Sequence, residues 1–142
     1  MRKLYHNYKI IALLPVIAVI IDYSLTFFFA DDSSMILSWE TSPFVRFALQ
    51  HDIMVLYLAG IILFYYVSSY TALRVLHNTD CYRFGVLLIG ILSITHVFGG
   101  MSWFFRNSLY SSSVGALSLI SIVIAFIVFG FSILNERVPA RN

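Results

Sequence analysis

Charged residues are scarce in this 142-residue sequence: Asp, Glu, Lys and Arg together make up 11% of it, against about 25% in ordinary soluble domains. Nine basic and seven acidic residues leave a formal net charge of +2. This balance argues against nucleic acid as a partner, because nucleic-acid binding needs basic residues gathered on one face. The single cysteine, Cys81, cannot form a disulfide within the chain. Its neighbours Asp80 and Tyr82 carry no positive charge, so we expect an inert thiol.

Hydrophobic residues are abundant instead, at 60% of the sequence, and the mean hydropathy is +0.87. They gather in four long runs, and at about 1.5 Å per residue a helical run of about 20 residues crosses about 30 Å of hydrocarbon. The sequence therefore predicts an all-α integral membrane protein, multi-pass in the cell membrane: one membrane domain over residues 1–142, with four transmembrane helices in a bundle. The expected spans cover about residues 10–30, 53–75, 85–105 and 114–134. Pro15 lies early in the first span and lacks a backbone donor, so it can kink that helix.

The longest polar connection, residues 31–52, follows the first span and holds four of the seven acidic residues. Ser42 followed by Pro43 is a good helix start, because serine caps and proline fits the first helical position. We expect a short helix over residues 43–50 in this outer loop. It either lies on the membrane surface or continues into the second span.

Lysine and arginine are unevenly divided between the two ends of the predicted spans, and positive charge favours the cytoplasmic side. Two of the nine basic residues, Arg46 and Arg106, lie on the same side as the long connection. We therefore expect both termini to be cytoplasmic and the long connection to face outward. The other seven are Arg2, Lys3, Lys9, Arg74, Arg83, Arg137 and Arg141.

An acidic side chain, Asp22, interrupts the first apolar run, and an ionisable group at such depth is a candidate for function. His96 lies at a similar level of the third span, since both residues are about 12 to 14 Å below the outer boundary. The two side chains could therefore meet. Thr26 is one turn outward from Asp22 on the same face. Together they would form a polar pocket below the long connection.

Glu40 and Arg46 flank the start of the short helix in that connection. Arg46 could pair with Glu40 or with Asp22 and so hold the loop across the mouth of the bundle. One interpretation is architectural, a loop held by charge or a buried structural pair at Asp22. The other is recognition of a ligand.

Asp22-Tyr-Ser-Leu-Thr26 and Glu40-Thr-Ser-Pro43-Phe-Val-Arg46 resemble the motifs of an uncharacterised family of small prokaryotic multi-spanning membrane proteins. That family carries Asp-x-x-x-Thr in the first span and a Glu-x-Asn-Pro-x-x-Arg box before the second. The match covers the first third of the chain, and Ser42 stands where the family usually has asparagine. The resemblance implies a helical bundle whose Asp22, Glu40 and Arg46 belong to one site, and it implies no activity.

Three functional hypotheses follow. The first is an outward-facing pocket that holds a polar ligand or a divalent metal at Asp22, Glu40 and His96, since carboxylate and imidazole suit zinc or iron. The second is an accessory or scaffold subunit, because small residues on the last two spans suit close packing with a membrane-protein partner or a second copy. The third, a proton relay, has few polar groups in the inner half of the bundle to continue it. None of them identifies an enzyme.

Overall fold

The computed structural model describes residues 7–136. This part of the chain is all-helical and contains no strand, and four helical segments are long and apolar enough to cross a membrane. The predicted all-α, four-span fold is therefore confirmed. The candidate spans are Tyr8–Phe29, Met54–Leu76, Tyr82–Phe105 and Ser108–Val128.

The first span is built from two helices, α2 (Tyr8–Ile11) and α3 (Leu14–Phe29), where one continuous helix was expected over residues 10–30. Pro15 lies in the first turn of α3 and has no N–H to donate to the carbonyl four residues before it. The interruption at residues 12–13 is thus the disturbance that this proline predicts.

Two short helices fill the connection after the first span: α4 (Ser33–Trp39) and α5 (Pro43–Gln50). The predicted helix 43–50 and its Ser42 cap are confirmed, and the Val45 N–H donates to the Ser42 hydroxyl oxygen at 3.5 Å. Helix α4 is absent from the sequence prediction. Asp32 caps it, because one carboxylate oxygen accepts from the Ser34 hydroxyl and from the Met35 N–H, each at 2.7 Å. These bonds hold the pKa of Asp32 below its usual range.

Helix α5 is not continuous with α6 (Met54–Leu76), which excludes the continuous arrangement that the sequence left open. Asp52 adopts a left-handed conformation with φ 56°, which aspartate tolerates better than most residues. The Ile53 N–H then bonds back to the Ala48 carbonyl at 2.9 Å and closes α5.

The last two helices, α7 (Tyr82–Phe105) and α8 (Ser108–Glu136), begin earlier than the predicted residues 85 and 114. Where a turn over residues 106–113 was expected, only Arg106 and Asn107 connect the helices. The Asn107 carboxamide oxygen accepts from the Tyr110 N–H at 3.1 Å, so the serines that follow can be helical.

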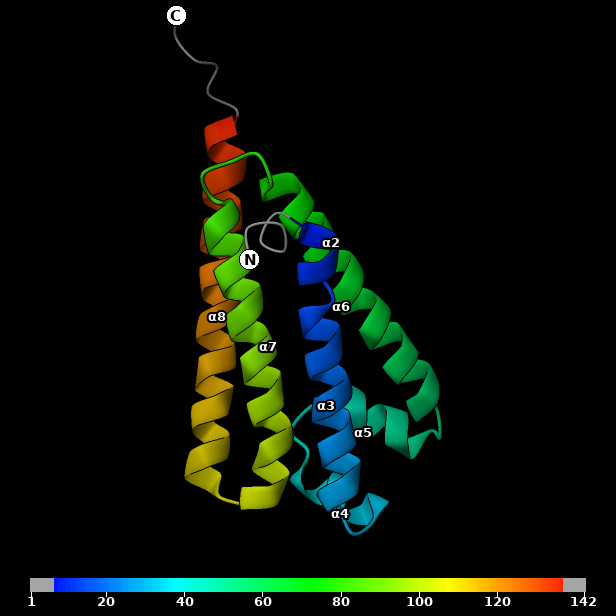
Figure 1. Cartoon of the computed structure of the whole chain (residues 1–142). Coiled ribbons are helices and arrows are strands. Elements are labelled where there is room, and N and C mark those ends of the chain that lie inside the picture. The colour runs from blue at the N-terminus through cyan, green and yellow to red at the C-terminus, as the bar shows by residue number, and fades with distance from the viewer. Residues whose placement is uncertain (1–6, 137–142) are drawn as a thin grey trace, which may run out of the picture.

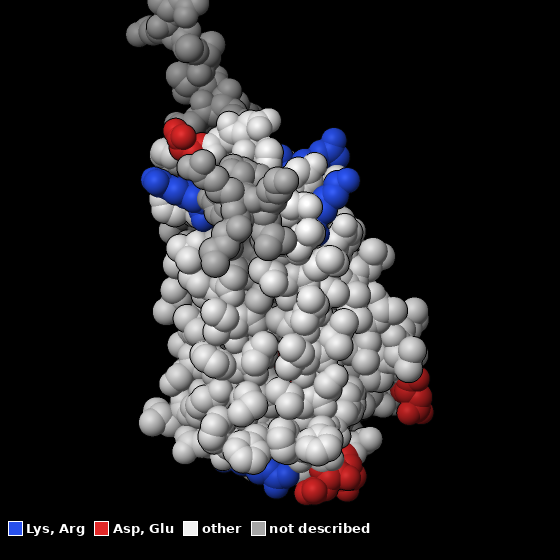
Figure 2. Space-filling view, in the orientation of Figure 1, with Lys and Arg blue, Asp and Glu red and all other residues white. Residues whose placement is uncertain are grey.

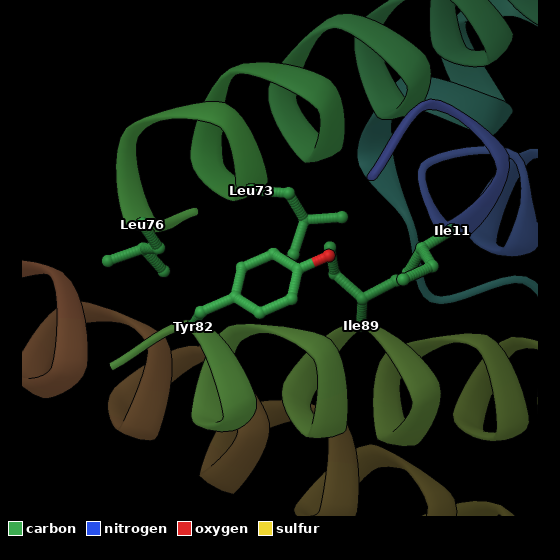
Figure 3. Close-up of a cluster of buried hydrophobic side chains, with 5 residues drawn as sticks. All are labelled: Ile11, Leu73, Leu76, Tyr82 and Ile89. Carbon is green, nitrogen blue, oxygen red and sulfur yellow. The ribbon is translucent and has the colours of Figure 1, made fainter. Parts of the chain in front are cut away.

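Helices α3 and α7 pack against each other, α8 covers another side of α7, and α6 slants away from α3 towards the end that carries α4 and α5 (Figure 1). The opposite end is closed by a buried apolar cluster from α2, α6 and α7 (Figure 3). The bundle is therefore tight at one end and splayed at the other. The cluster consists of Ile11, Leu73, Leu76, Tyr82 and Ile89.

The outer surface suits a bilayer. Large apolar side chains point outward, for example Phe28 at 80% exposure and Val55 at 83%. Figure 2 shows Lys, Arg, Asp and Glu of the described residues at the two ends of the molecule, with an uncharged band between them on the visible face. Such a band buries apolar atoms in lipid and leaves charges at the water boundaries. The protein is thus a small multi-pass membrane protein. Arg2, Lys3, Arg137 and Arg141, which enter the charge count, lie outside the described residues.

Gly100 sets the distance between α7 and α3. A Cβ atom at this position would lie 2.8 Å from Asp22 Cα and 2.9 Å from the Asp22 carbonyl oxygen. Backbone atoms of a packed helix cannot yield as a flexible side chain would. Only glycine therefore allows the two helices to approach this closely beside Asp22.

We predict that Gly100→Ala destabilises the protein by about 1 to 3 kcal/mol, the usual cost of overpacking. The free energy of unfolding, measured by reversible denaturation in mixed micelles, checks this. Gly90→Ala is the matched control on the same helix, because a Cβ there meets nothing within 4 Å. Equal stability of the two variants would contradict the close approach.

Candidate functional site

Asp22 on α3 and His96 on α7 form the contact that their equal depth predicts. His96 Nδ1 lies 2.9 Å from Asp22 Oδ2, within hydrogen-bonding and ion-pair distance. The side chain of Asp22 is 20% exposed and that of His96 is 23% exposed, so neither is fully exposed to lipid and neither is fully buried. An acidic group inside the bundle thus has the partner that burial demands.

Tyr65 on α6 extends this contact into a chain of three side chains from three helices. Its hydroxyl lies 2.6 Å from His96 Nε2, and its ring meets the imidazole edge-on with centroids 4.8 Å apart. Tyr65 was not among the predicted site residues. Tyr65, Tyr66 and Tyr70 lie near one end of the second span, where tyrosines commonly occupy the membrane interface. Only the position of α6 in the bundle shows that Tyr65 contacts His96.

The two contacts of His96 are compatible with a chain of hydrogen bonds that runs in one direction. With Asp22 as a carboxylate, which can only accept, and His96 as a singly protonated ring, the imidazole hydrogen is on Nδ1 and is donated to Oδ2. Nε2 is then an acceptor and takes the hydroxyl hydrogen of Tyr65. The phenolic oxygen is left with its lone pairs free.

A pair of hydrogen-bonded tyrosines also lines the same side of the bundle. The hydroxyl groups of Tyr23 on α3 and Tyr57 on α6 are 2.9 Å apart, and their rings meet edge-on. Tyr23 follows Asp22 directly in the sequence. The Tyr23–Tyr57 pair thus bridges α3 and α6, and the Tyr65–His96 contact bridges α6 and α7.

These groups line a cavity of about 650 Å³. The cavity has walls from α3, α6, α7 and α8, and residues 39–42 between α4 and α5 line it as well. Its lining on α8 runs from Ser111 to Ile122, which corresponds to about 16 Å of helix. The cavity therefore extends from the end that carries α4 and α5 into the apolar band, as far as the level of His96.

The remaining predicted site residues fall into two groups. Thr26 and Glu40 line the cavity. The Thr26 hydroxyl donates to the Asp22 backbone carbonyl at 3.0 Å and so does not touch its carboxylate. Glu40 Oε1 accepts from the Ser42 N–H at 2.7 Å and closes the turn before α5.

Arg46 is not brought to the site. It is exposed on α5, does not line the cavity, and forms no ion pair with Glu40 or Asp22. Arg106 at the end of α7 is the arginine that lines the cavity. It donates to the carbonyls of Phe29 at 2.9 Å and Trp103 at 3.3 Å, and it lies 3.8 Å from Asp31. Arg106 could not be preferred from sequence alone, because its position depends on how α3 and α7 end side by side.

A three-ligand metal centre is not assembled by residues 7–136. No three His, Cys, Asp or Glu side chains lie close enough together to hold an ion, so Glu40 does not join Asp22 and His96 as predicted. His51 and Asp52 are exposed at the end of α5 and do not line the cavity. The pair of Asp22 and His96 supplies at most two ligands.

Comparisons of this chain with known protein families, curated proteins and solved structures give no match. The resemblance on the Asp22 and Glu40 motifs therefore stays a prediction. Function has to be argued from the cavity and the side chains that line it.

We predict that Asp22 and Tyr65 are energetically coupled through His96. Asp22→Ala and Tyr65→Phe should each lower the free energy of unfolding by about 1 kcal/mol or more. Their combined effect should differ from the sum by about 0.5 kcal/mol or more, because both act on one imidazole. A double-mutant cycle in mixed micelles measures this coupling.

Tyr66→Phe combined with Asp22→Ala is the control for that cycle. Tyr66 neighbours Tyr65 on α6, makes no hydrogen bond through its hydroxyl among the described residues, and does not line the cavity. We expect these two changes to add. If the Tyr65 pair added equally well, the three side chains would not form one unit.

Proposed function

We propose that this multi-pass membrane protein binds a small ligand in the cavity beneath the connection between α4 and α5. The observation that supports the proposal is that a hydrogen-bonded chain from three helices, Asp22–His96–Tyr65, lines a 650 Å³ cavity. Ligand pockets commonly have about 300 to 1,000 Å³ of space, mainly apolar walls and a few convergent polar groups. A protein that needed only helix packing would fill this space with side chains.

The cavity faces outward in this proposal. Of the described basic residues, Lys9, Arg74 and Arg83 belong to the end away from the cavity mouth, whereas Arg46 and Arg106 belong to the end that carries it. The excess at the far end favours a cytoplasmic position for that end.

The stripe of small residues on α8 supports the pocket better than a scaffold role. Gly115 and Ser118 line the cavity, and Ser121, which is 1% exposed, is packed inside the chain. These residues are therefore used within the protein, and no partner is needed to explain them.

We predict that a cysteine in the cavity is open to a small thiol reagent. In a Cys81→Ser background, Ser118→Cys should react with N-ethylmaleimide at least tenfold faster than Ser121→Cys, because maleimides need a hydrated thiolate. The two positions are matched: both are serines on α8, one turn apart, one in the cavity wall and one buried. The labelled fraction over time is read by mass spectrometry.

If Ser118→Cys reacted with N-ethylmaleimide as slowly as Ser121→Cys, the cavity would be closed to small molecules. That result would contradict the binding proposal. The same variant tests on which side of the membrane the cavity opens. A membrane-impermeant maleimide added to intact cells should label it, and labelling only in inverted vesicles would reverse the orientation.

A further inference from the structure

Carboxylate oxygens that line the cavity keep unused hydrogen-bond acceptor sites. Asp22 Oδ2 is used by His96, but Oδ1 has no hydrogen-bond partner among the described residues. Since no fully buried side-chain oxygen or nitrogen there lacks a partner, Oδ1 is accessible rather than buried. It lies beside Gly99, where even a methyl group would come within 3.4 Å of it. Gly99 thus leaves this oxygen uncovered.

Tyr65 and Glu40 supply further hydrogen-bond acceptors to the cavity. With its hydrogen donated to His96 Nε2, the Tyr65 oxygen presents lone pairs. Glu40 accepts one backbone N–H through Oε1, and its other oxygen has no protein partner in the described chain. A ligand that satisfies these groups must donate hydrogen bonds.

The charges that line the cavity favour a cation. They are those of Asp22, Glu40 and Arg106. The Arg106 guanidinium is engaged at the rim by two backbone carbonyls and lies near Asp31, which makes it a poor partner for the deeper carboxylate. Asp22 is hydrogen-bonded to His96 through Oδ2. An anionic ligand would meet two carboxylates and lose its hydration.

Aromatic faces complete the environment. Trp39, Trp103, Tyr23 and Tyr57 all line the cavity. Aromatic rings attract cations through the negative potential of their faces, and this attraction strengthens away from water. Apolar walls between the rings accept a hydrocarbon body.

We propose that the cavity takes a compact hydrophobic amine, whose ammonium group donates to Asp22 Oδ1 and the Tyr65 oxygen while its apolar part lies among the aromatic rings. The proposal rests on the binding role proposed above. The free volume accommodates an aryl-alkyl amine, and a group in reach of Asp22 must enter with its charged end deep in the pocket. A common phospholipid, whose head group stays at the water boundary, would place its tail there instead.

Three probes of nearly equal shape test the charge: 2-phenylethylamine, 2-phenylethanol and phenylacetate. Binding is followed by tryptophan fluorescence, because the two tryptophans of the chain, Trp39 and Trp103, both line the cavity. We expect the ammonium form to bind at least tenfold more tightly than the alcohol, as a charged hydrogen bond allows. Phenylacetate should bind most weakly.

Asp22→Asn should reduce the preference for the amine over the alcohol to about threefold or less, since the amide keeps the shape and removes the charge. Asp52→Asn is the matched control, because Asp52 is exposed outside the cavity and asparagine tolerates its left-handed backbone. It should keep the full preference.

The probe series on the unchanged protein keeps the test valid if Asp22→Asn does not fold. Equal binding of the three probes, tighter binding of phenylacetate, or no binding of any probe would each overturn the amine proposal. Ser118→Cys labelling separates the two failures: a reactive thiol with no preference for amines leaves the pocket standing, and an inert thiol removes both.

Discussion

The hydrogen bond between Asp22 and His96 is the constraint on which the rest of the structure depends. An acidic side chain at this depth must have a partner, and His96 can serve only if α3 and α7 lie close together. Gly100 makes that approach possible, because a Cβ atom there would lie within 3 Å of the Asp22 backbone. Helix packing and polar pairing are therefore one requirement, met at one level of the bundle.

The packing of the helices differs between the two ends of the bundle, on either side of the Asp22–His96 contact. Towards α2 the helices converge on the apolar cluster around Leu73 and Leu76, which leaves no space. Towards α4 and α5 helix α6 diverges, and its Tyr57 and Tyr65 reach back to α3 and α7 by hydrogen bonds. The cavity lies on this side, with the imidazole near its inner part and Glu40 near its mouth. Divergence of a single helix thus creates the space, and two tyrosines keep it structured.

Much of the fold follows from the sequence, because apolar length, the Ser42-Pro43 start and Pro15 act locally. Equal depth also sufficed to pair Asp22 with His96. Groups whose role depends on how helices tilt were missed: Tyr65 was not among the predicted site residues, and Arg106 was counted only for its charge. Arg46 was expected at the mouth because it follows Glu40 closely, but the rotation of α5 turns it outward. Helix α4 was missed because it has only seven residues within a polar connection, where the Asp32 cap is its main local signal.

The tautomer of His96 tests the central claim most directly, because the direction of the hydrogen bonds from Tyr65 through His96 to Asp22 depends on it. Nitrogen-15 NMR of protein labelled in its histidine rings reports which nitrogen is protonated, and His96→Gln assigns the signal. We expect one protonated nitrogen, Nδ1, and an Nε2 that accepts from Tyr65 and loses this interaction in Tyr65→Phe. A ring protonated at Nε2, or one that exchanges between tautomers as free imidazole does, would contradict the chain from Asp22 through His96 to Tyr65.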